Sequence, residues 1–252
     1  MIASKRFGSL IIISSHQISS CVYLNNNYFI SSTKLNYTEK LKNIFFDDCS
    51  IIGKEKFLNS AVIIPILIIE NKEYVLFEKR SNNVRQPGEI SFPGGHFDPH
   101  LDKDYFSTAL RETSEELGLS IERINIIGRL GTLVAPMGVI VETFVGYLNI
   151  DNINSLHIDK KEVDRVFILP LDFFVNNNPE EYHTRLELHP YVVNKTGQKL
   201  ELFPVKELGL PERYANSWTN GKHRVLVYKT SEEVIWGITA ELIFELSKKL
   251  RN

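Results

Sequence analysis

The spacing of apolar and polar positions along the chain predicts a mixed α/β protein. Apolar residues run almost unbroken through 61–69 and recur through 74–80, with four polar residues between the two stretches. This pattern predicts a hairpin whose first strand is buried. Shorter signals of the same kind predict further strands over 89–92, 124–133, 139–148, 162–169, 182–188, 199–203 and 224–229.

Two stretches have the spacing of amphipathic helices. Within 104–117, at about 100° per residue, the positions expected to face the core are Phe106, Ala109, Leu110, Thr113 and Leu117. Gly118 supplies a helix stop. Residues 239–250 predict a closing helix, and 38–58 and 171–175 predict short ones. Because strands and helices do not alternate regularly, we expect a mixed sheet with helices packed on its faces.

Composition narrows the class of protein. The chain has 252 residues and a net charge of −2, so no broad basic face is available to bind nucleic acid. Cys21 and Cys49 are the only cysteines, which argues against a zinc site or a disulfide scaffold and favours the cytoplasm. The apolar run 61–69 is too short to span a bilayer, so no membrane partner is expected.

The first residues differ in composition from the rest. Residues 1–37 contain no Asp or Glu and are rich in Ser, Asn and Ile. We expect an N-terminal extension over 1–37 followed by one domain over 38–252. A targeting peptide is the alternative for the extension.

Three carboxylates in the predicted helix 104–117 carry the chemistry. Glu112, Glu115 and Glu116 fall on an arc about 100° wide beside the core face, where they repel one another. Such a cluster suits Mg²⁺ or Mn²⁺, which take oxygen ligands and share them with substrate phosphates. Gly94 and Gly95 precede the helix and let backbone approach a ligand closely. The alternative is a solvated acidic helix end.

Gly95 and the run RETSEELGL at 111–119 resemble the Nudix box, G-x5-E-x7-R-E-U-x-E-E-x-G-U, in which U is apolar. Upstream, LFEKRSNNVRQPGEISFPGG resembles the coenzyme A pyrophosphatase signature L-L-T-x-R-S-x3-R-x3-G-x3-F-P-G-G. Residues 234–240 resemble the WGxTA segment of the same branch. The chain is thus similar to Nudix hydrolases of the coenzyme A pyrophosphatase branch. The resemblance implies an α/β Nudix fold, an α/β/α sandwich with a mixed β-sheet.

The chain departs from these patterns at several positions. The loop between Gly95 and the Arg-Glu pair is two residues longer, and the first Glu of the box has no strict counterpart, although Asp98 and Asp102 lie nearby. Thr113 stands where an aliphatic residue is usual. Glu78 replaces the usual Thr, and the link from Arg85 to the next Gly is one residue shorter. These changes lie where substrate enters.

The resemblance implies hydrolysis of the diphosphate of coenzyme A or acyl-CoA to 3′,5′-ADP and (acyl-)4′-phosphopantetheine. Alternatives are another nucleoside diphosphate derivative such as ADP-ribose, or a non-catalytic nucleotide-binding module. We expect the general base to be Glu115 or another nearby carboxylate, of which Glu142 is one candidate, and a homodimer is left open. The site residues expected are, for metal, Glu112, Glu115, Glu116 and Gly95; for catalysis, Glu115, Glu112 and Arg111; and for substrate, Arg80, Arg85 and Gly94.

Overall fold

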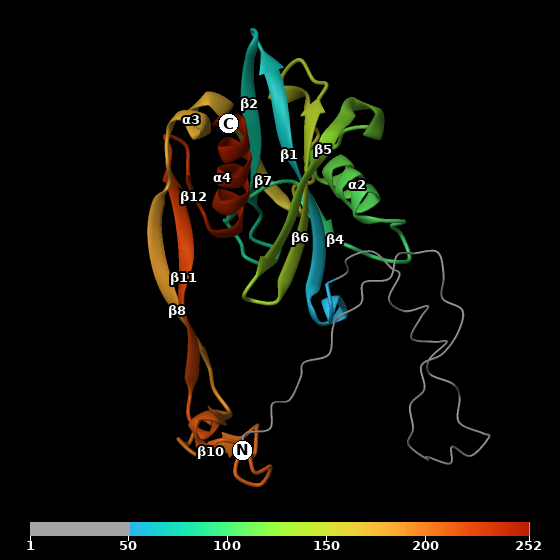
Figure 1. The fold of residues 1–252 in the computed structure, drawn as a ribbon. Coiled ribbons are helices and arrows are strands. Elements are labelled where there is room, and N and C mark those ends of the chain that lie inside the picture. Colours follow the sequence, from blue (N-terminus) through green and yellow to red (C-terminus); the bar gives the residue numbers. More distant parts are fainter. Residues whose placement is uncertain (1–50, 252) are drawn as a thin grey trace, which may run out of the picture. The chain divides into compact units, whose positions relative to one another are not determined.

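A computed structural model describes residues 51–251 of the chain (Figure 1). Seven strands form one mixed sheet in the order β3-β2-β1-β6-β5, with β4 also paired to β1 and β7 to β2. β1 and β6 run parallel, and the other pairs are antiparallel. The strands are β1 Leu58–Ile69, β2 Lys72–Arg80, β3 Ile90–Ser91, β4 Gly94–His96, β5 Ile124–Ala135, β6 Val139–Leu148 and β7 Val163–Pro170.

The predicted hairpin is present and turns in two residues. Ile69 pairs with Lys72, and the residues between them, Glu70 and Asn71, have φ angles of 50° and 61°. Two central residues with positive φ give the turn type whose twist matches paired strands. The register places the apolar stretch of β1 at the centre of the sheet.

Helices cover both faces of this sheet, as Figure 1 shows. Alternation along β2 supplies both cores: Leu76 packs in the cluster that contains Leu117 of α2 (Tyr105–Leu117), whereas Phe77 packs in the cluster that contains Ile243 of α4 (Gly237–Arg251). A short helix, α3 (Leu171–Asn176), joins α4 on its side of the sheet. The α/β/α sandwich expected from the sequence is therefore confirmed.

Helix α2 begins and ends as the sequence predicts, but its buried face differs in part. Asp104 caps the N-terminus by accepting the backbone N–H of Ser107, and Gly118 ends the helix at φ 62°. Ala109, Thr113 and Leu117 are buried as expected. Phe106 is 45% exposed, so its placement in the core was wrong, and Leu110 is only half-buried. Thr108 lies in the core instead.

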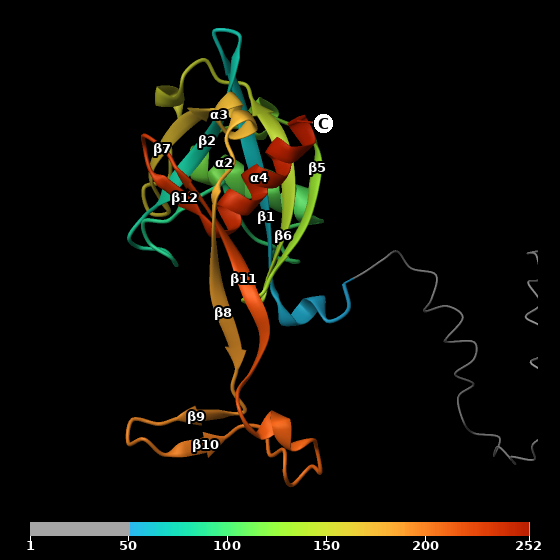
Figure 2. The ribbon, with the colours of Figure 1, turned by 60° about the vertical axis from the view of Figure 1, so that its left-hand side comes forward.

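A two-stranded arm extends from the sandwich (Figure 2). It consists of β8 (Glu180–Leu188) paired with β11 (Trp218–Lys229), and every residue of β8 is exposed. The connection between them holds β9 (Tyr191–Val193), β10 (Lys199–Glu201) and the 3₁₀ helix Glu212–Ala215. The strands predicted at 182–188, 199–203 and 224–229 are thus present. β4, β9 and β12 (Val234–Trp236) were not predicted as strands.

Three further 3₁₀ turns complete the described chain, at Lys54–Lys56, Ile121–Arg123 and Ile153–Ser155. Of the short helix predicted at 38–58, residues 51–58 can be compared, and there the prediction was wrong: they hold only the 3₁₀ turn Lys54–Lys56 and the first residue of β1. Residues 38–50 and the extension 1–37 lie outside the described residues. Within 51–251, no helix is long and apolar enough to cross a bilayer.

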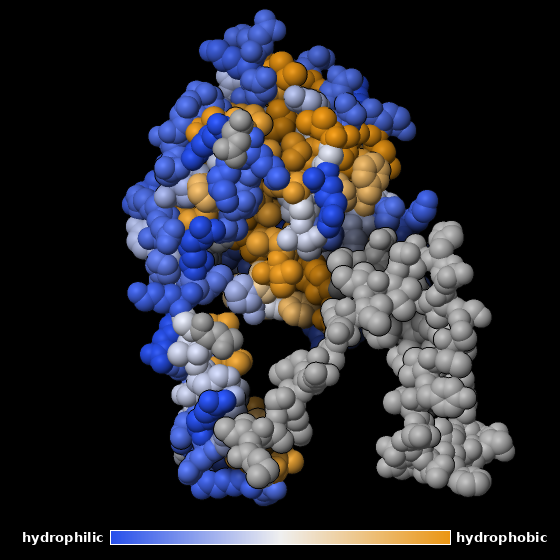
Figure 3. Space-filling model, in the orientation of Figure 1, coloured by the Kyte–Doolittle hydropathy of each residue, from blue (hydrophilic) through white to orange (hydrophobic). Residues whose placement is uncertain are grey.

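A hollow of about 420 Å³ lies between β5 and α4, on the opposite face of the sheet from α2. Figure 3 shows apolar side chains gathered on the face of the molecule over β5 and β6 beside α4. Leu130, Leu133 and Leu242 line the hollow, with Glu241 and Lys249 also in its wall. The acidic face of α2 is on the other side of the sheet, so this hollow is separate from the predicted site.

Candidate active site

The site is built where β4 runs alongside the start of β1 beneath α2. Gly94 pairs with Val62 and Gly95 with Ala61. A Cβ on Gly94, whose φ is 149°, would lie 2.2 Å from the carbonyl oxygen of Ala61. Only glycine fits this approach. The Gly-Gly pair therefore brings its backbone directly under the acidic face of the helix.

Two helix carboxylates lie against this glycine strand. A Cβ on Gly95 would come within 2.3 Å of the Glu112 carboxyl carbon, so the Glu112 side chain occupies that space. The backbone N–H of Gly94 donates to Oε2 of Glu116 at 2.8 Å. Glu116 is 3% exposed, and burial together with repulsion from neighbouring carboxylates raises its pKa well above the usual range. Burial also raises the pKa of Glu112.

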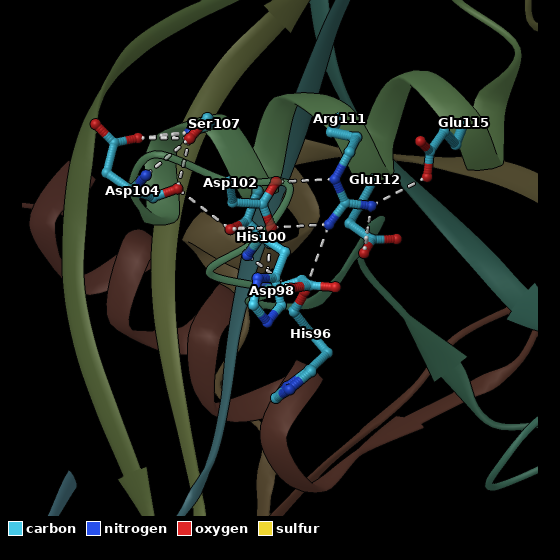
Figure 4. A network of polar contacts seen from close by, with 10 residues as sticks. His96, Asp98, His100, Asp102, Asp104, Ser107, Arg111, Glu112 and Glu115 are labelled. Carbon is cyan, nitrogen blue, oxygen red and sulfur yellow. Dashed lines mark hydrogen bonds and ion pairs between the residues drawn. The ribbon is translucent and has the colours of Figure 1, made fainter. Parts of the chain in front are cut away.

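Arg111 is the centre of a polar network that Figure 4 shows. Its guanidinium donates to both carboxylate oxygens of Asp102, at 2.8 and 2.9 Å, and also pairs with Glu112 at 2.9 Å and Glu115 at 3.1 Å. Hydrogen bonding to Arg111 lowers the pKa of Asp102 to about 2. Of the two acids near the missing first Glu of the box, Asp98 and Asp102, it is Asp102 that pairs with Arg111.

The lengthened loop folds around the same carboxylate. The backbone N–H of Asp98 and the hydroxyl of Thr108 donate to Oδ2 of Asp102, at 3.1 and 3.0 Å. The backbone N–H groups of Leu101 and Asp102 donate in turn to the carbonyl of Asp98. The longer loop thus encloses Asp102, which is 5% exposed, and fixes the partner of Arg111.

The two candidates for a general base sit differently. The Glu115 side chain is 61% exposed and is held beside Arg111. Glu142, on β6, is buried and accepts from Arg129 at 2.7 Å and Thr132 at 2.9 Å. Glu142 pairs with Ala61 of β1, which pairs with Gly95 on its other side. Glu142 therefore stands two strands from the glycine pair, in the same row of the sheet.

The residue types in this site fit a divalent metal ion. Among residues 51–251, no three Asp, Glu, His or Cys side chains converge on one point, and Arg111 takes oxygens of Glu112 and Glu115 as partners. The available donors are nevertheless hard oxygens that repel one another, which is the donor set that Mg²⁺ and Mn²⁺ take. The Glu112 carboxylate rests against the backbone of Gly95. Arg111 contacts one oxygen of each of these two carboxylates, Oε1 of Glu112 and Oε2 of Glu115.

The arginines expected to bind substrate lie in one loop beside the site. Arg80 ends β2, and its Nε donates to the carbonyl of Arg85 at 3.0 Å. Two backbone hydrogen bonds close the loop: the Arg80 N–H donates to the carbonyl of Glu89 at 2.9 Å, and the Gly88 N–H donates to the carbonyl of Arg80 at 3.0 Å. Arg85 is exposed. Arg85 is therefore accessible to a ligand, whereas Arg80 also stabilises the loop.

Two carboxylates of this region were not recognised as site residues from the sequence. Glu78, on β2, is 1% exposed, and Glu162 lies just before β7; both repel Glu116. The strand pattern contained a signal for Glu78, because it follows Leu76 by two residues and so shares the face toward α2. The pairing of β7 with β2 brings Glu162 near the site. The sequence around Glu162 does not indicate which strand β7 pairs with.

Comparison with known proteins places the chain in a family. A profile of the NUDIX domain matches residues 58–191, more than half of the chain. The chain belongs to the Nudix family. The glycine pair, Arg111 and the acidic helix all lie within the matched segment, and the relatives of this family member are Nudix hydrolases.

Two of the relatives are coenzyme A diphosphatases. The chain is 36% identical over 137 residues to the peroxisomal coenzyme A diphosphatase NUDT7 of Mus musculus, covering 54% of this chain and 55% of that protein. It is 35% identical over 127 residues to the mitochondrial coenzyme A diphosphatase NUDT8 of Homo sapiens, covering 49% and 53%. These matches span about half the length of each relative. They support the coenzyme A pyrophosphatase branch.

A longer match is bacterial. The Nudix hydrolase NudL of Photorhabdus laumondii is 30% identical over 194 residues, which cover 77% of this chain and 85% of that protein. Among solved structures, a C. elegans Ap4A hydrolase aligns with a TM-score of 0.39 at 22% identity, over 46% of this chain and 83% of that chain.

Proposed function

We propose that the protein hydrolyses the diphosphate of coenzyme A or acyl-CoA. Water is added across the P–O–P anhydride, giving 3′,5′-ADP and 4′-phosphopantetheine or its acyl form. The observation that carries the proposal is the packing of Glu112 and Glu116 against Gly94–Gly95 in a chain similar to two coenzyme A diphosphatases.

The proposed cofactor is Mg²⁺ or Mn²⁺. Glu112, Glu115 and Glu116, with the carbonyl of Gly95, would hold the metal. When bound, the metal neutralises phosphate charge and makes a coordinated water more acidic. The buried position of Glu116 fixes its carboxylate through the Gly94 N–H, so this ligand is already oriented by the backbone.

Arg111 is proposed to assist catalysis by placing the carboxylates. Bidentate pairing with Asp102 fixes the guanidinium plane. Nη1 of Arg111 contacts both Glu112 and Glu115. It therefore orients these two carboxylates before the metal binds. Glu115, exposed and beside the other acids, and Glu142, fixed in the sheet, remain the two proposed bases.

The substrate is proposed to approach from the loop that follows β2. Arg85 is exposed there and suits bidentate binding of phosphate. Arg80 lies at the base of the same loop, where its backbone and side chain hold the loop closed. Gly94 is proposed to contact the diphosphate through its backbone, because the space that a side chain would take is filled by Ala61 and Val62 of β1.

Two further proposals concern domain organisation and location. We propose that residues 1–37 form an extension and 38–252 the hydrolase domain. We also propose that the protein acts in the cytoplasm. A homodimer would use the arm, where four apolar side chains are each more than half exposed: Val193, Leu200, Leu202 and Leu208. Light scattering on the wild type and on a Leu200→Ser, Leu202→Ser variant tests the dimer: a dimer that becomes a monomer supports the arm contact, and a wild-type monomer excludes it.

A substrate panel tests the proposed activity. The purified protein is incubated with Mg²⁺ or Mn²⁺ and coenzyme A, acetyl-CoA, ADP-ribose, NADH, a dinucleoside polyphosphate or dGTP, and kcat/KM is compared. We expect coenzyme A or its acyl form to be preferred and 3′,5′-ADP to appear. A tenfold preference for ADP-ribose over coenzyme A would overturn the assignment. Binding without turnover would indicate a nucleotide-binding module.

A further inference from the structure

Glu78 is a buried carboxylate whose position the proposed chemistry does not yet use. It lies on β2 opposite Ser91 of β3 and is 1% exposed. Because Leu76, two residues earlier, packs in the same cluster as Leu117 of α2, the Glu78 side chain points to the α2 face of the sheet. It therefore enters the region under the acidic face of the helix.

Half of this carboxylate has no partner. Oε1 accepts a hydrogen bond from the Ser91 hydroxyl at 2.9 Å, whereas Oε2 is fully buried and has no hydrogen-bond partner within the described chain. A buried polar atom without a partner costs about 1–3 kcal/mol, and more when it is charged. An orphaned oxygen in this place calls for a ligand that the protein itself does not supply.

The surrounding charges indicate which ligand that is. Repulsion from Glu112 and Glu162 disfavours the ionised form of Glu78. Glu78 and Glu116 also repel each other. Arg80 favours the ionised form, but its side chain is also bonded to the carbonyl of Arg85. Burial raises the pKa of Glu78 to about 7. A concentration of negative charge around an unpartnered oxygen is suited to a divalent cation.

A structural role does not explain the residue equally well. The hydrogen bond to Ser91 needs only an acceptor, which a neutral Gln or Thr side chain also offers. Either residue would avoid the repulsion from Glu116 and the burial of a charge. The carboxylate therefore adds nothing to the packing of β2 against β3 that a neutral side chain would lack.

We propose that Glu78 is a further metal ligand of the site, binding a divalent cation through Oε2 together with Glu116. The inference rests on the proposed metal-dependent function and deepens it, because it adds a carboxylate from the sheet to those of the helix. The cation would then be held between β2 and α2.

Mn²⁺ binding without substrate tests this proposal. Free Mn²⁺ is measured by electron paramagnetic resonance during titration of the wild type and of Glu78→Gln, which keeps the shape and the acceptor for Ser91. We expect Glu78→Gln to lose one bound Mn²⁺ or to bind it at least tenfold more weakly. Glu73→Gln, an exposed position on the same strand, removes the same charge and should bind as the wild type does.

The reference variant Glu116→Gln separates two kinds of failure. If it weakens Mn²⁺ binding while Glu78→Gln binds like the wild type, the role of Glu78 is wrong and the proposed function stands. If the wild type binds no Mn²⁺, both are wrong. Should Glu78→Gln not fold, Glu78→Thr is titrated instead, and the rise in Tm on adding Mn²⁺ is compared with that of the wild type. An equal rise would overturn the proposal.

Discussion

Asp102 and Arg111 form a bidentate ion pair, with the guanidinium Nε and Nη2 at 2.8 and 2.9 Å from the two carboxylate oxygens. The Asp102 side chain is 1% exposed. The pair joins the loop after β4 to the middle of α2, so it connects the glycine strand to the acidic face of the helix. The same guanidinium also contacts Glu112, which rests on Gly95.

We expect Asp102→Asn to lower both stability and activity. Breaking a buried ion pair by removing one partner costs about 3–5 kcal/mol, and we expect about 2–4 kcal/mol here because Arg111 retains two other carboxylates. Activity should fall by about 10- to 100-fold, as for residues that orient metal ligands. Urea unfolding and kcat/KM measure the two effects. An unchanged free energy of unfolding would show that the pair does not support the site.

The same pair predicts an acid dependence. The pKa of Asp102 is about 2 in the folded protein and 3.8 in its ordinary state, so the folded value is depressed. The stabilisation is present above pH 3.8 and is lost as pH falls toward 2, and it amounts to about 2 kcal/mol. Urea unfolding of the wild type and of Asp102→Asn from pH 5 to 2 should show the gap between them narrowing by about this amount. A constant gap would contradict the assignment.

Gly95→Ala should lower activity strongly while the protein still folds. The added Cβ would meet the Glu112 carboxyl at 2.3 Å, which is the far end of a side chain that can move. The carboxylate is then displaced from the glycine strand, and we expect kcat/KM to fall on the order of 100-fold, as for a displaced ligand or its support. Gly128→Ala is the matched control, because no atom lies within 4 Å of its added Cβ. Equal activity in both variants would remove Glu112 from the site.

The sequence predicted most of the fold because its signals are local. The turn at Glu70-Asn71 and the stop at Gly118 each depend on a few neighbouring residues. Phe106 was misplaced because helical spacing gives its angle around the helix but not how much of the helix surface the sheet covers. Its ring contacts that of Phe144 on β6 while the residue stays 45% exposed. The strands of the arm were predicted, but their exposure to solvent was not, because it depends on which other elements pack against them.

The site was predicted in part for the same reason. Helical spacing brings Glu112, Glu115 and Glu116 together. Which of them is buried depends on where the sheet packs against the helix: Glu116 is buried and Glu115 is exposed. Asp102 could not be chosen over Asp98, because the loop path decides which acid meets Arg111. Glu78 approaches the helix through long-range strand pairing. Contacts distant in sequence therefore account for what was missed.

The central claim is that the carboxylates of α2 support metal-dependent cleavage of coenzyme A. The most direct measurement is kcat/KM for coenzyme A with Mg²⁺, for the wild type, Glu116→Gln and the control Glu73→Gln, with both products identified by mass spectrometry. We expect 3′,5′-ADP and 4′-phosphopantetheine from the wild type and the control. We expect Glu116→Gln to lose Mg²⁺-dependent turnover, with circular dichroism showing an intact fold. Full activity in Glu116→Gln would show that this carboxylate does not support the reaction.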